Sequence, residues 1–221
     1  MKSLGGKPLV VWGIEEAKKA SSLDAFLVST DDDEIAEVCR NAGASVPFKR
    51  PIELSQDKDG KETDTSWVFK HALEWYEQTN NKRVSHIVGL QCTSPLRKAQ
   101  DIDACVHIAK TTNADTVLSV TKARQNPYWA MEFNTVTQQL RSFMDIPLEG
   151  NNLISQNLPL ILYPNGAVYV TRRDWIMNGR IYGEKIHGYI MPEERSIDID
   201  TELDFIVCSA IAATINKNEP L

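Results

Sequence analysis

The sequence lacks the features of a secreted or membrane-embedded protein. Within its 221 residues, no apolar run approaches the ~18 residues that a membrane-spanning helix needs. The first seven residues, Met1 to Lys7, contain no apolar signal-peptide core. Only four cysteines occur and none forms a C-x-x-C pair, so we expect reduced thiols rather than a disulfide framework. These absences predict a cytoplasmic protein with no membrane partner.

The sequence also lacks an excess of basic residues. Lysine and arginine total 24 while aspartate and glutamate total 30, which gives a formal net charge of −6. A general nucleic-acid-binding protein would present a basic face, so we expect no nucleic-acid partner. An acidic protein can still bind an anionic small molecule, provided that arginine, lysine or a metal ion offsets the repulsion locally.

The common catalytic and phosphate-binding motifs are absent too. The sequence contains no Ser-His-Asp ordering, zinc-binding cluster, G-x-G-x-x-G or Walker A motif, and Gly5-Gly6-Lys7 is too short to cradle a phosphate. His71 stands beside Ala72 and Leu73 in a helix-like segment, which favours a core or capping role. Any chemistry must therefore come from residues that are scattered along the chain.

What the sequence does contain is the pattern of one α/β domain. Its 42% hydrophobic and 24% charged residues are typical of globular proteins. Apolar periodicity predicts helices over residues 8–21, 31–42, 63–79, 99–111 and 201–216. Short apolar runs predict strands over residues 26–30, 84–90, 116–120, 167–171 and 185–191. This alternation is typical of a parallel sheet built from βα units, which binds ligands at the carboxyl ends of its strands.

The stretch from residue 126 to residue 164 breaks this alternation. It is polar, it has no long periodic run, and it carries four prolines at positions 127, 147, 159 and 164. Nearly forty residues without a βα unit are too many for a simple loop. We expect either a protruding arm that pairs with a second subunit or a lid over the ligand.

Asp198-Ile199-Asp200 is the most specific candidate site in the sequence. In an extended backbone, residues i and i+2 project to the same face, so the two carboxylates would lie side by side. Paired carboxylate oxygens suit a hard cation such as Mg²⁺, which shares its coordination shell with water and substrate phosphates. The alternative is helix capping, with Asp200 or Thr201 at the N-cap and Asp198 merely solvated.

Three further segments offer polar groups close to predicted strands. Gln91 to Arg97 places an amide, hydroxyls and a guanidinium after a buried strand, where they can contact a ligand or form a turn in which Arg97 pairs with an acidic neighbour. Arg50 is held extended by Pro51, so it can bind a phosphate or a base, or form a surface salt bridge. Asn165 precedes a strand, either as turn chemistry or as a ligand contact.

Taken in order, these segments closely resemble the acylneuraminate cytidylyltransferases, also called CMP-sialic acid synthetases. The resemblance runs from about Leu4 to Ala210, and the ordered set is more specific than any one segment. The matching segments are Leu4 to Leu9, Val28 to Asp32 with Glu34 to Ala36, Arg50-Pro51 with Glu53-Leu54, Gln91 to Arg97, Asn165 to Tyr169, and Ser196 to Phe205. The resemblance implies a Rossmann-like three-layer sandwich of the nucleotide-diphospho-sugar transferase type, with a mostly parallel sheet.

The resemblance also implies a function. Family members join CTP to a nonulosonic (sialic-type) acid with the help of Mg²⁺, giving the CMP-sugar and pyrophosphate. They are homodimers, and residues 126–164 match the arm that reaches into the partner's active site. Residue by residue, the resemblance implies that Asp198 and Asp200 hold the metal. It places Arg50 against the cytidine, with Thr63 and Thr65 near the base and ribose. It also places Gln91, Asn165 and Gln156 facing the sugar, with Tyr169 as one wall of the pocket.

The sequence departs from the family pattern at three places. Family members begin with a strand and a glycine-rich loop that cradles the triphosphate, and Met1 falls where that loop ends. We therefore expect the single domain of residues 1–221 to lack this strand and loop and to show little activity and reduced stability. Ser155 stands where the family often has an arginine for the sugar carboxylate, which points to a sialic-acid relative such as legionaminate. Cys92 replaces a usual proline, which we expect to be tolerated.

Two other functions stay open at this point. One is a catalytically silent homologue that binds a ligand or pairs with an intact subunit. The other is a related nucleotidyltransferase for another sugar or base, such as the ketodeoxyoctonate enzymes. The predicted arm and the segment from Asp198 to Asp204 favour the cytidylyltransferase for a nonulosonic acid.

Overall fold

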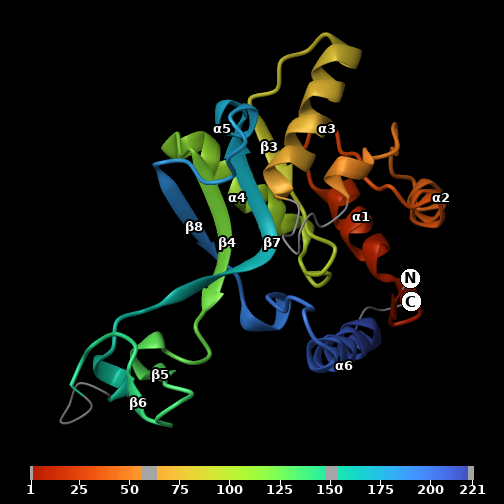
Figure 1. Ribbon diagram of the computed structural model, residues 1–221. Helices are drawn as coiled ribbons and strands as arrows, with labels where there is room; N and C mark the ends of the chain where they lie inside the picture. Colours follow the sequence, from red (N-terminus) through yellow and green to blue (C-terminus); the bar gives the residue numbers. More distant parts are fainter. Residues whose placement is uncertain (1, 56–63, 148–153, 219–221) are drawn as a thin grey trace.

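The computed structural model describes residues 2–55, 64–147 and 154–218 (Figure 1). The helices are α1 (Leu9–Lys19), α2 (Asp33–Asn41), α3 (Thr65–Asn80), α4 (Ala99–Thr112), α5 (Arg173–Met177) and α6 (Glu202–Asn218). The strands are β1 (Ser3–Leu4), β2 (Lys7–Pro8), β3 (His86–Gly89), β4 (Thr116–Lys122), β5 (Met131–Phe133), β6 (Leu140–Ser142), β7 (Leu162–Arg172) and β8 (Ile186–Ile190). Single 3-10 turns are η1 (Ile52–Leu54), η2 (Pro127–Trp129), η4 (Ser155–Asn157) and η5 (Glu193–Arg195).

The five predicted helices are confirmed because local signals determine where they begin and end. Asp32 caps α2 by accepting a hydrogen bond from the Ile35 amide at 2.9 Å. Asp64 caps α3 in the same way through the Ser66 amide at 2.8 Å. Asn113 ends α4 in the left-handed conformation, with φ of 52°. In the described part of the chain, no helix combines the length and apolar character needed to cross a membrane.

The central sheet has the strand order β3-β7-β4-β8. Strands β4 and β8 pair in parallel, whereas β7 is antiparallel to both β3 and β4. The sheet is therefore mixed, which corrects the expectation of parallel βα units at β7. The chain re-enters the sheet at the end of β4 that it left, with Lys122 opposite Leu162, and β7 then runs back along β4 in the opposite direction.

The predicted strand over residues 26–30 is extended but forms only isolated bridges. Leu27 pairs with Ser45 and Thr30 pairs with Lys49, both in parallel, with α2 as the crossover between them. These residues are separate from the four-stranded sheet in the described structure. Their apolar side chains instead pack with α1 and α2, around the buried Ile14 and Cys39.

The sheet lies between two layers of covering elements. Val117 and Val170 are cross-strand partners that belong to the same buried cluster as Ile102 of α4. The next pair, Thr116 and Thr171, points to the opposite face because side chains alternate along a strand. Both of these hydroxyls donate to the Ile181 carbonyl, at 2.7 and 2.9 Å, so the segment after α5 covers that face. This is the predicted three-layer sandwich (Figure 1).

A long excursion leaves the sheet after β4 and returns at β7. Figure 1 shows it extending away from the sheet, with β5 and β6 paired as an antiparallel hairpin at its far end. The ladder between β4 and β7 reaches Leu162, so the last three residues of the predicted arm, 162–164, are part of the sheet. The remainder of the described arm is rich in exposed side chains.

Candidate active site

Side chains from two predicted site segments, residues 91–97 and 198–200, converge on Gly166, near the start of β7. The φ angle of Gly166 is 72°, a left-handed conformation that favours glycine. A Cβ atom at this position would lie 2.5 Å from Asp198 Oδ2, 2.7 Å from Gln91 Oε1 and 2.8 Å from Ser94 Oγ. The absence of a side chain at residue 166 therefore allows three oxygen-bearing groups to approach one point. The structure thus brings together Gln91 and Asp198, as the sequence predicted for the carboxyl ends of the strands.

Ser94 links these segments from beneath. It is fully buried, and its Oγ lies 3.1 Å from the Asn165 carbonyl and 3.2 Å from Asp198 Oδ1. The Ile199 amide adds a backbone link by donating to the Thr93 carbonyl at 2.9 Å. The segment that carries Asp198 is therefore fixed against the loop that follows β3.

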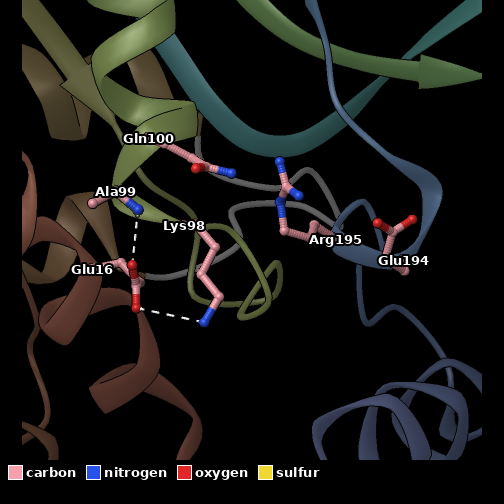
Figure 2. A pocket seen from close by; sticks show the side chains of 6 residues that line it. All are labelled: Glu16, Lys98, Ala99, Gln100, Glu194 and Arg195. Carbon is pink, nitrogen blue, oxygen red and sulfur yellow. Dashed lines mark hydrogen bonds and ion pairs between the residues drawn. The ribbon is translucent and has the colours of Figure 1, made fainter. Parts of the chain in front are cut away.

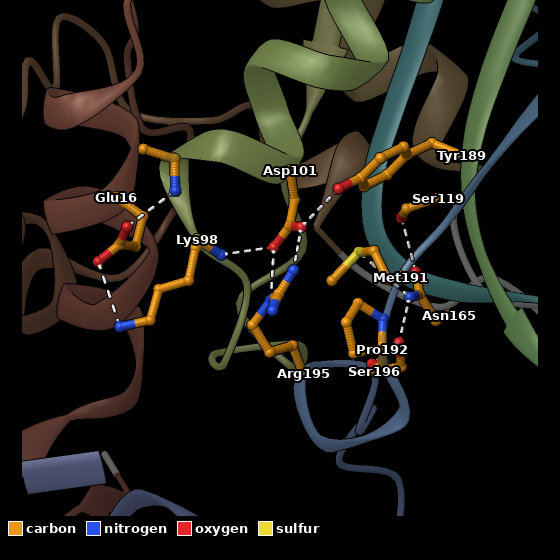
Figure 3. Close-up of polar contacts among 11 residues, drawn as sticks. Glu16, Lys98, Asp101, Ser119, Asn165, Tyr189, Met191, Pro192, Arg195 and Ser196 are labelled. Carbon is orange, nitrogen blue, oxygen red and sulfur yellow. Dashed lines mark hydrogen bonds and ion pairs between the residues drawn. The ribbon is translucent and has the colours of Figure 1, made fainter. Parts of the chain in front are cut away.

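Asn165 is 4% exposed, and its side-chain amide is fully engaged within the protein. Its Oδ1 accepts from Ser119 Oγ at 2.6 Å and from the Ala167 amide at 3.2 Å. Its Nδ2 donates to Ser196 Oγ at 2.9 Å and to Met191 Sδ at 3.3 Å (Figure 3). A side-chain amide has two donor hydrogens and two acceptor positions, so this set uses all of them. The contact of Asn165 with a sugar stays a prediction.

Arg97 is a buried cation whose partners differ from those that the sequence suggested. It is 1% exposed, and no carboxylate in the described residues lies within 4.0 Å of it, which is contrary to the expected acidic partner. Its Nε donates to the Ala167 carbonyl at 2.8 Å and its Nη2 donates to the Gln91 carbonyl. Burial lowers the pKa of Arg97 to about 10, against the opposing effect of nearby acidic groups including Asp198. Arg97 is therefore still charged at neutral pH.

Tyr169 belongs to the same neighbourhood. It is half-buried on β7, opposite Gly89 of β3 and Leu118 of β4. Burial raises the pKa of the Tyr169 hydroxyl, and the charge of Asp198 adds to this effect. The phenol is therefore neutral at physiological pH and close enough to Asp198 for the two groups to interact electrostatically.

A cavity of about 230 Å³ opens beside Asp198. It is lined by Thr121, Lys122, Ala123, Arg124, Tyr163, Glu193, Ser196, Ile197, Asp198 and Asp204. The Thr121 hydroxyl is buried and has no hydrogen-bond partner in the described structure. Lys122 and Arg124 form no ion pair with any described residue, so two cations are available at one wall of the cavity. In the sequence, Thr121 and Lys122 are polar residues directly after the predicted strand over residues 116–120, and nothing there signals Arg124.

The comparison with known proteins identifies the family. Residues 1–144 match the sequence profile of a family described as Cytidylyltransferase. The chain belongs to the cytidylyltransferase family. This confirms the predicted enzyme class, a nucleotidyltransferase of the acylneuraminate cytidylyltransferase type.

Similar proteins match this cytidylyltransferase over more than nine-tenths of its length. It is 32% identical to a CMP-N,N'-diacetyllegionaminic acid synthase of Legionella pneumophila, over 91% of this chain and 84% of that protein. It is 30% identical to an N-acylneuraminate cytidylyltransferase of Streptococcus agalactiae, over 93% of this chain but only 47% of that longer protein. A solved CMP:2-keto-3-deoxy-manno-octonic acid synthetase aligns with a TM-score of 0.64 over 97% of this chain and 91% of that one, at 15% identity, which shows the fold alone.

The oxygen atoms around Gly166 form a donor set that suits a hard cation. Asp198 supplies a carboxylate and Gln91 an amide oxygen, which are ligand types that Mg²⁺ accepts. Within the described ranges, no three His, Cys, Asp or Glu side chains are grouped closely enough to hold a metal. Magnesium normally shares its shell with water and phosphates, so one or two carboxylates are sufficient.

Asp200 is exposed, and the capping of α6 falls to its neighbours. The amide and hydroxyl of Thr201 both donate to Asp204 Oδ2, at 2.8 and 2.7 Å, and the Asp204 amide lies 3.3 Å from Thr201 Oγ1. This is the reciprocal arrangement of a helix cap. The cap is therefore Thr201, one of the two residues that the sequence offered for it. Asp200 does not provide the cap through its side chain, and Asp198 is bonded by Ser94 rather than merely solvated.

The remaining predicted site residues lie elsewhere in the structure. Arg50 donates from Nη2 to Asp31 Oδ1 at 3.1 Å, while its buried Nε has no partner in the described residues. Thr65 begins α3 and is half-buried, and Thr63 lies outside the described residues. Gln156 is exposed on the arm. No hydrogen bond or ion pair joins these groups to the Gly166 cluster in the part of the chain that the structure describes.

A second cavity, of about 550 Å³, contains none of the predicted site residues. Figure 2 shows it at the beginning of α4, where it is lined by Glu16, Lys98, Ala99, Gln100, Glu194 and Arg195. Three of its lining residues, Glu16, Lys98 and Ala99, contact one another, and Arg195 is bonded to Asp101. Glu16, which is 7% exposed, accepts from the Ala99 amide at 2.8 Å and lies 3.9 Å from Lys98 Nζ. This cavity is therefore a surface above a structural network rather than a second candidate active site.

Proposed function

We propose that the chain transfers a cytidylyl group from CTP to a nonulosonic acid, giving the CMP-sugar and pyrophosphate. The observation that carries this proposal is the convergence of Gln91, Ser94 and Asp198 on Gly166, in a member of the cytidylyltransferase family. The names of the similar proteins, which are synthases of CMP-legionaminic acid and cytidylyltransferases for acylneuraminate, support this substrate class.

Asp198, with Asp200 two residues later, would hold Mg²⁺ in this reaction. The metal would neutralise phosphate charge and orient the in-line attack of the sugar hydroxyl on the α-phosphate. Asp198 is well suited to this role because Ser94 fixes one of its oxygens, while the other lies beside Gly166, close to the point that Gln91 Oε1 also approaches. Asp200 is exposed, and in this proposal it would supply the second carboxylate to the same ion.

The acceptor sugar would lie over Gly166, between Gln91 and the 230 Å³ cavity. The Gln91 amide can hydrogen-bond a sugar hydroxyl, and Tyr169 would form one wall. At neutral pH the α-keto acid carries a carboxylate, which needs a cationic partner. Lys122 and Arg124 line the cavity and have no ion pair in the described structure, so they are our candidates for this contact. They would compensate for the arm arginine that Ser155 replaces.

The nucleotide would lie on the side of Arg50. Asp31 orients the Arg50 guanidinium, and the unpartnered buried Nε leaves a donor for a base or phosphate oxygen. Although burial opposes it, hydrogen bonds from the Asp31 amide and Arg50 hold the pKa of Asp31 below its ordinary value. The pair is therefore charged on both sides at neutral pH. Thr63 and Thr65 complete the proposed nucleotide contacts.

We infer a cytoplasmic homodimer of single-domain subunits, held together by the arm. Exposed large apolar side chains are concentrated on the arm and need a covering surface in water. They include Phe133, Val136, Leu140, Phe143 and Leu160, which are 54 to 89% exposed. Gln156 on the same arm would then approach the active site of the partner. Sedimentation velocity tests this: the wild type should run as a dimer and Phe143→Asp as a monomer, and a monomeric wild type would overturn the proposal.

The proposed reaction is tested by pyrophosphate release. The 221-residue protein would be mixed with CTP, Mg²⁺ and a panel containing N-acetylneuraminate, diacetyllegionaminate and ketodeoxyoctonate. In line with the low activity expected from the sequence, we expect slow release with a nine-carbon acid, dependence of this release on Mg²⁺, and a loss of at least a hundredfold in Asp198→Asn. A folded wild type that binds CTP or sugar without releasing pyrophosphate would instead establish the catalytically silent homologue.

A further inference from the structure

The segment between β8 and α6 carries Asp198, and one of its anchors is a buried ion pair. Asp101, in the first turn of α4, is completely buried. Arg195 reaches it with two parallel hydrogen bonds, from Nη2 to Oδ1 at 2.7 Å and from Nε to Oδ2 at 3.1 Å. Such a two-point contact fixes the direction of the guanidinium as well as its distance. Arg195 is only three residues before Asp198, so its position limits where that carboxylate can lie.

Asp101 is itself held rigidly. Tyr189 of β8 donates its hydroxyl to Oδ1 at 3.2 Å, and the Lys98 amide donates to Oδ2 at 2.9 Å (Figure 3). The start of α4 is further tied to α1, because Glu16 accepts from the Ala99 amide (Figure 2). The carboxylate of Asp101 therefore joins β8, α4 and the segment after β8 at one buried point.

A second anchor follows one residue later. Ser196 Oγ accepts from Asn165 Nδ2 at 2.9 Å and donates to the Pro192 carbonyl at 2.8 Å. At the start of the segment, the Met191 amide donates to the Val120 carbonyl at 2.8 Å. The segment is thus fixed at Met191, Arg195 and Ser196, and Figure 3 shows the contacts of Arg195 and Ser196. Only the Arg195 anchor depends on a pair of opposite charges.

We propose that Asp101 and Arg195 are a positioning pair for the metal-binding carboxylate of Asp198. This inference rests on the proposed function, because it assigns the pair a role in holding the cation-binding group. Residues outside the coordination shell can orient the metal ligands. Removing such a residue typically lowers metal affinity 10- to 100-fold. Displacement of a reacting group by about 1 Å can cost two orders of magnitude in rate. Neither Asp101 nor Arg195 touches the substrate in this proposal.

The test compares two conservative variants with a matched control. Asp101→Asn keeps the size of the side chain and removes the charge, while Arg195→Lys keeps the charge and removes the two-point contact. Glu77→Gln breaks another two-point pair, with Arg173, in which both distances are 2.8 Å. Arg173 follows the end of β7 opposite to Gly166, so the control perturbs stability without acting on the Asp198 segment.

The first measurement is hydrogen–deuterium exchange of residues 191–200 in the protein without ligands, which needs no activity. We expect faster exchange of this segment in Asp101→Asn and Arg195→Lys, and no change there in Glu77→Gln. The second measurement is Mn²⁺ binding in the presence of CTP by electron paramagnetic resonance. We expect the Mn²⁺ dissociation constant to rise about tenfold in the two variants and to stay constant in the control.

The outcomes separate the anchoring role of the pair from its effect on Asp198 and from the proposed function. Unchanged exchange over residues 191–200 in Asp101→Asn would overturn the anchoring role itself. Faster exchange with unchanged Mn²⁺ affinity would overturn positioning and leave a purely structural pair. A wild type that binds no Mn²⁺ with CTP and releases no pyrophosphate would overturn the proposed function, and the exchange experiment would still report on the anchor.

Discussion

Gly166 and Asp198 are so close that a Cβ atom on residue 166 would lie 2.5 Å from the Asp198 carboxylate. Gly166→Ala therefore meets both a left-handed backbone and a carboxylate oxygen. We expect destabilisation of about 1–3 kcal/mol from the backbone strain, together with a rate loss of about a hundredfold because Asp198 must move. Urea unfolding and pyrophosphate release measure the two effects.

Gly179 supplies the matched control for this substitution. Its φ angle is 69°, close to that of Gly166, but the nearest neighbour of its added Cβ would be the Trp67 ring, at 3.2 Å. Gly179→Ala should lose comparable stability and keep the wild-type rate. An equal rate loss in both alanine variants would show that strain alone, and not the displacement of Asp198, lowers activity.

Arg97 is expected to stabilise the site through its hydrogen bonds rather than through an ion pair. Replacing it with methionine leaves the carbonyls of Gln91 and Ala167 without their donor, and we expect a loss of about 1–3 kcal/mol in unfolding free energy. Arg97→Lys keeps the charge but provides a single donor point, so it should recover only part of this loss. Full recovery by lysine, in urea unfolding, would contradict the hydrogen-bond explanation.

The sequence predicted the elements whose signals are local. Asp32 and Asp64 cap the first turns of α2 and α3, and an apolar periodicity follows each cap. These two helices were therefore expected nearly in full. The direction of β7 was not, because it depends on the pairing of Lys122 with Leu162 across an excursion of nearly forty residues. Nothing in the sequence near either strand reports such a long-range pairing.

The same distinction applies to the site. Gln91 and Asp198 were expected to lie close because both follow strands whose carboxyl ends meet at one edge. The engagement of Asn165 could not be predicted, since its partners Ser119, Met191 and Ser196 come from distant segments. Arg195 was missed for a similar reason: its buried partner Asp101 is 94 residues away and resembles an ordinary helix-capping residue in the sequence.

Acid should weaken the contact between α3 and α5. Hydrogen bonds from Arg173 lower the pKa of Glu77 from 4.5 to about 2. Because the folded-state pKa lies below the unfolded one, this stabilisation is complete above about pH 4.5 and is lost as the pH falls towards 2. The pair is largely buried, and we expect it to contribute on the order of 1–3 kcal/mol at neutral pH.

Urea unfolding at several pH values checks this expectation. The difference in unfolding free energy between the wild type and Glu77→Gln should shrink between pH 6 and pH 3.5. Glu74, on the same helix, lies 4.0 Å from Lys70 and is more exposed, so Glu74→Gln should show no comparable pH dependence. A difference that stays constant with pH in Glu77→Gln would mean that the Glu77 charge does not stabilise the fold.

Lys122 and Arg124 should determine affinity for the acidic sugar and not for the nucleotide. Both line the cavity beside Asp198. Hydrogen bonds from Thr201 lower the pKa of Asp204, and the charge of Arg124 adds a smaller effect in the same direction. If they bind the sugar carboxylate, Lys122→Ala and Arg124→Ala should each raise the KM for the sugar about tenfold, or about 1.4 kcal/mol, and leave the KM for CTP unchanged. Lys82→Ala, at an exposed turn after α3, is the charge-matched control and should change neither. An increase in the KM for CTP instead would place these cations on the triphosphate, because a carboxylate subsite on the sugar side cannot alter nucleotide affinity alone.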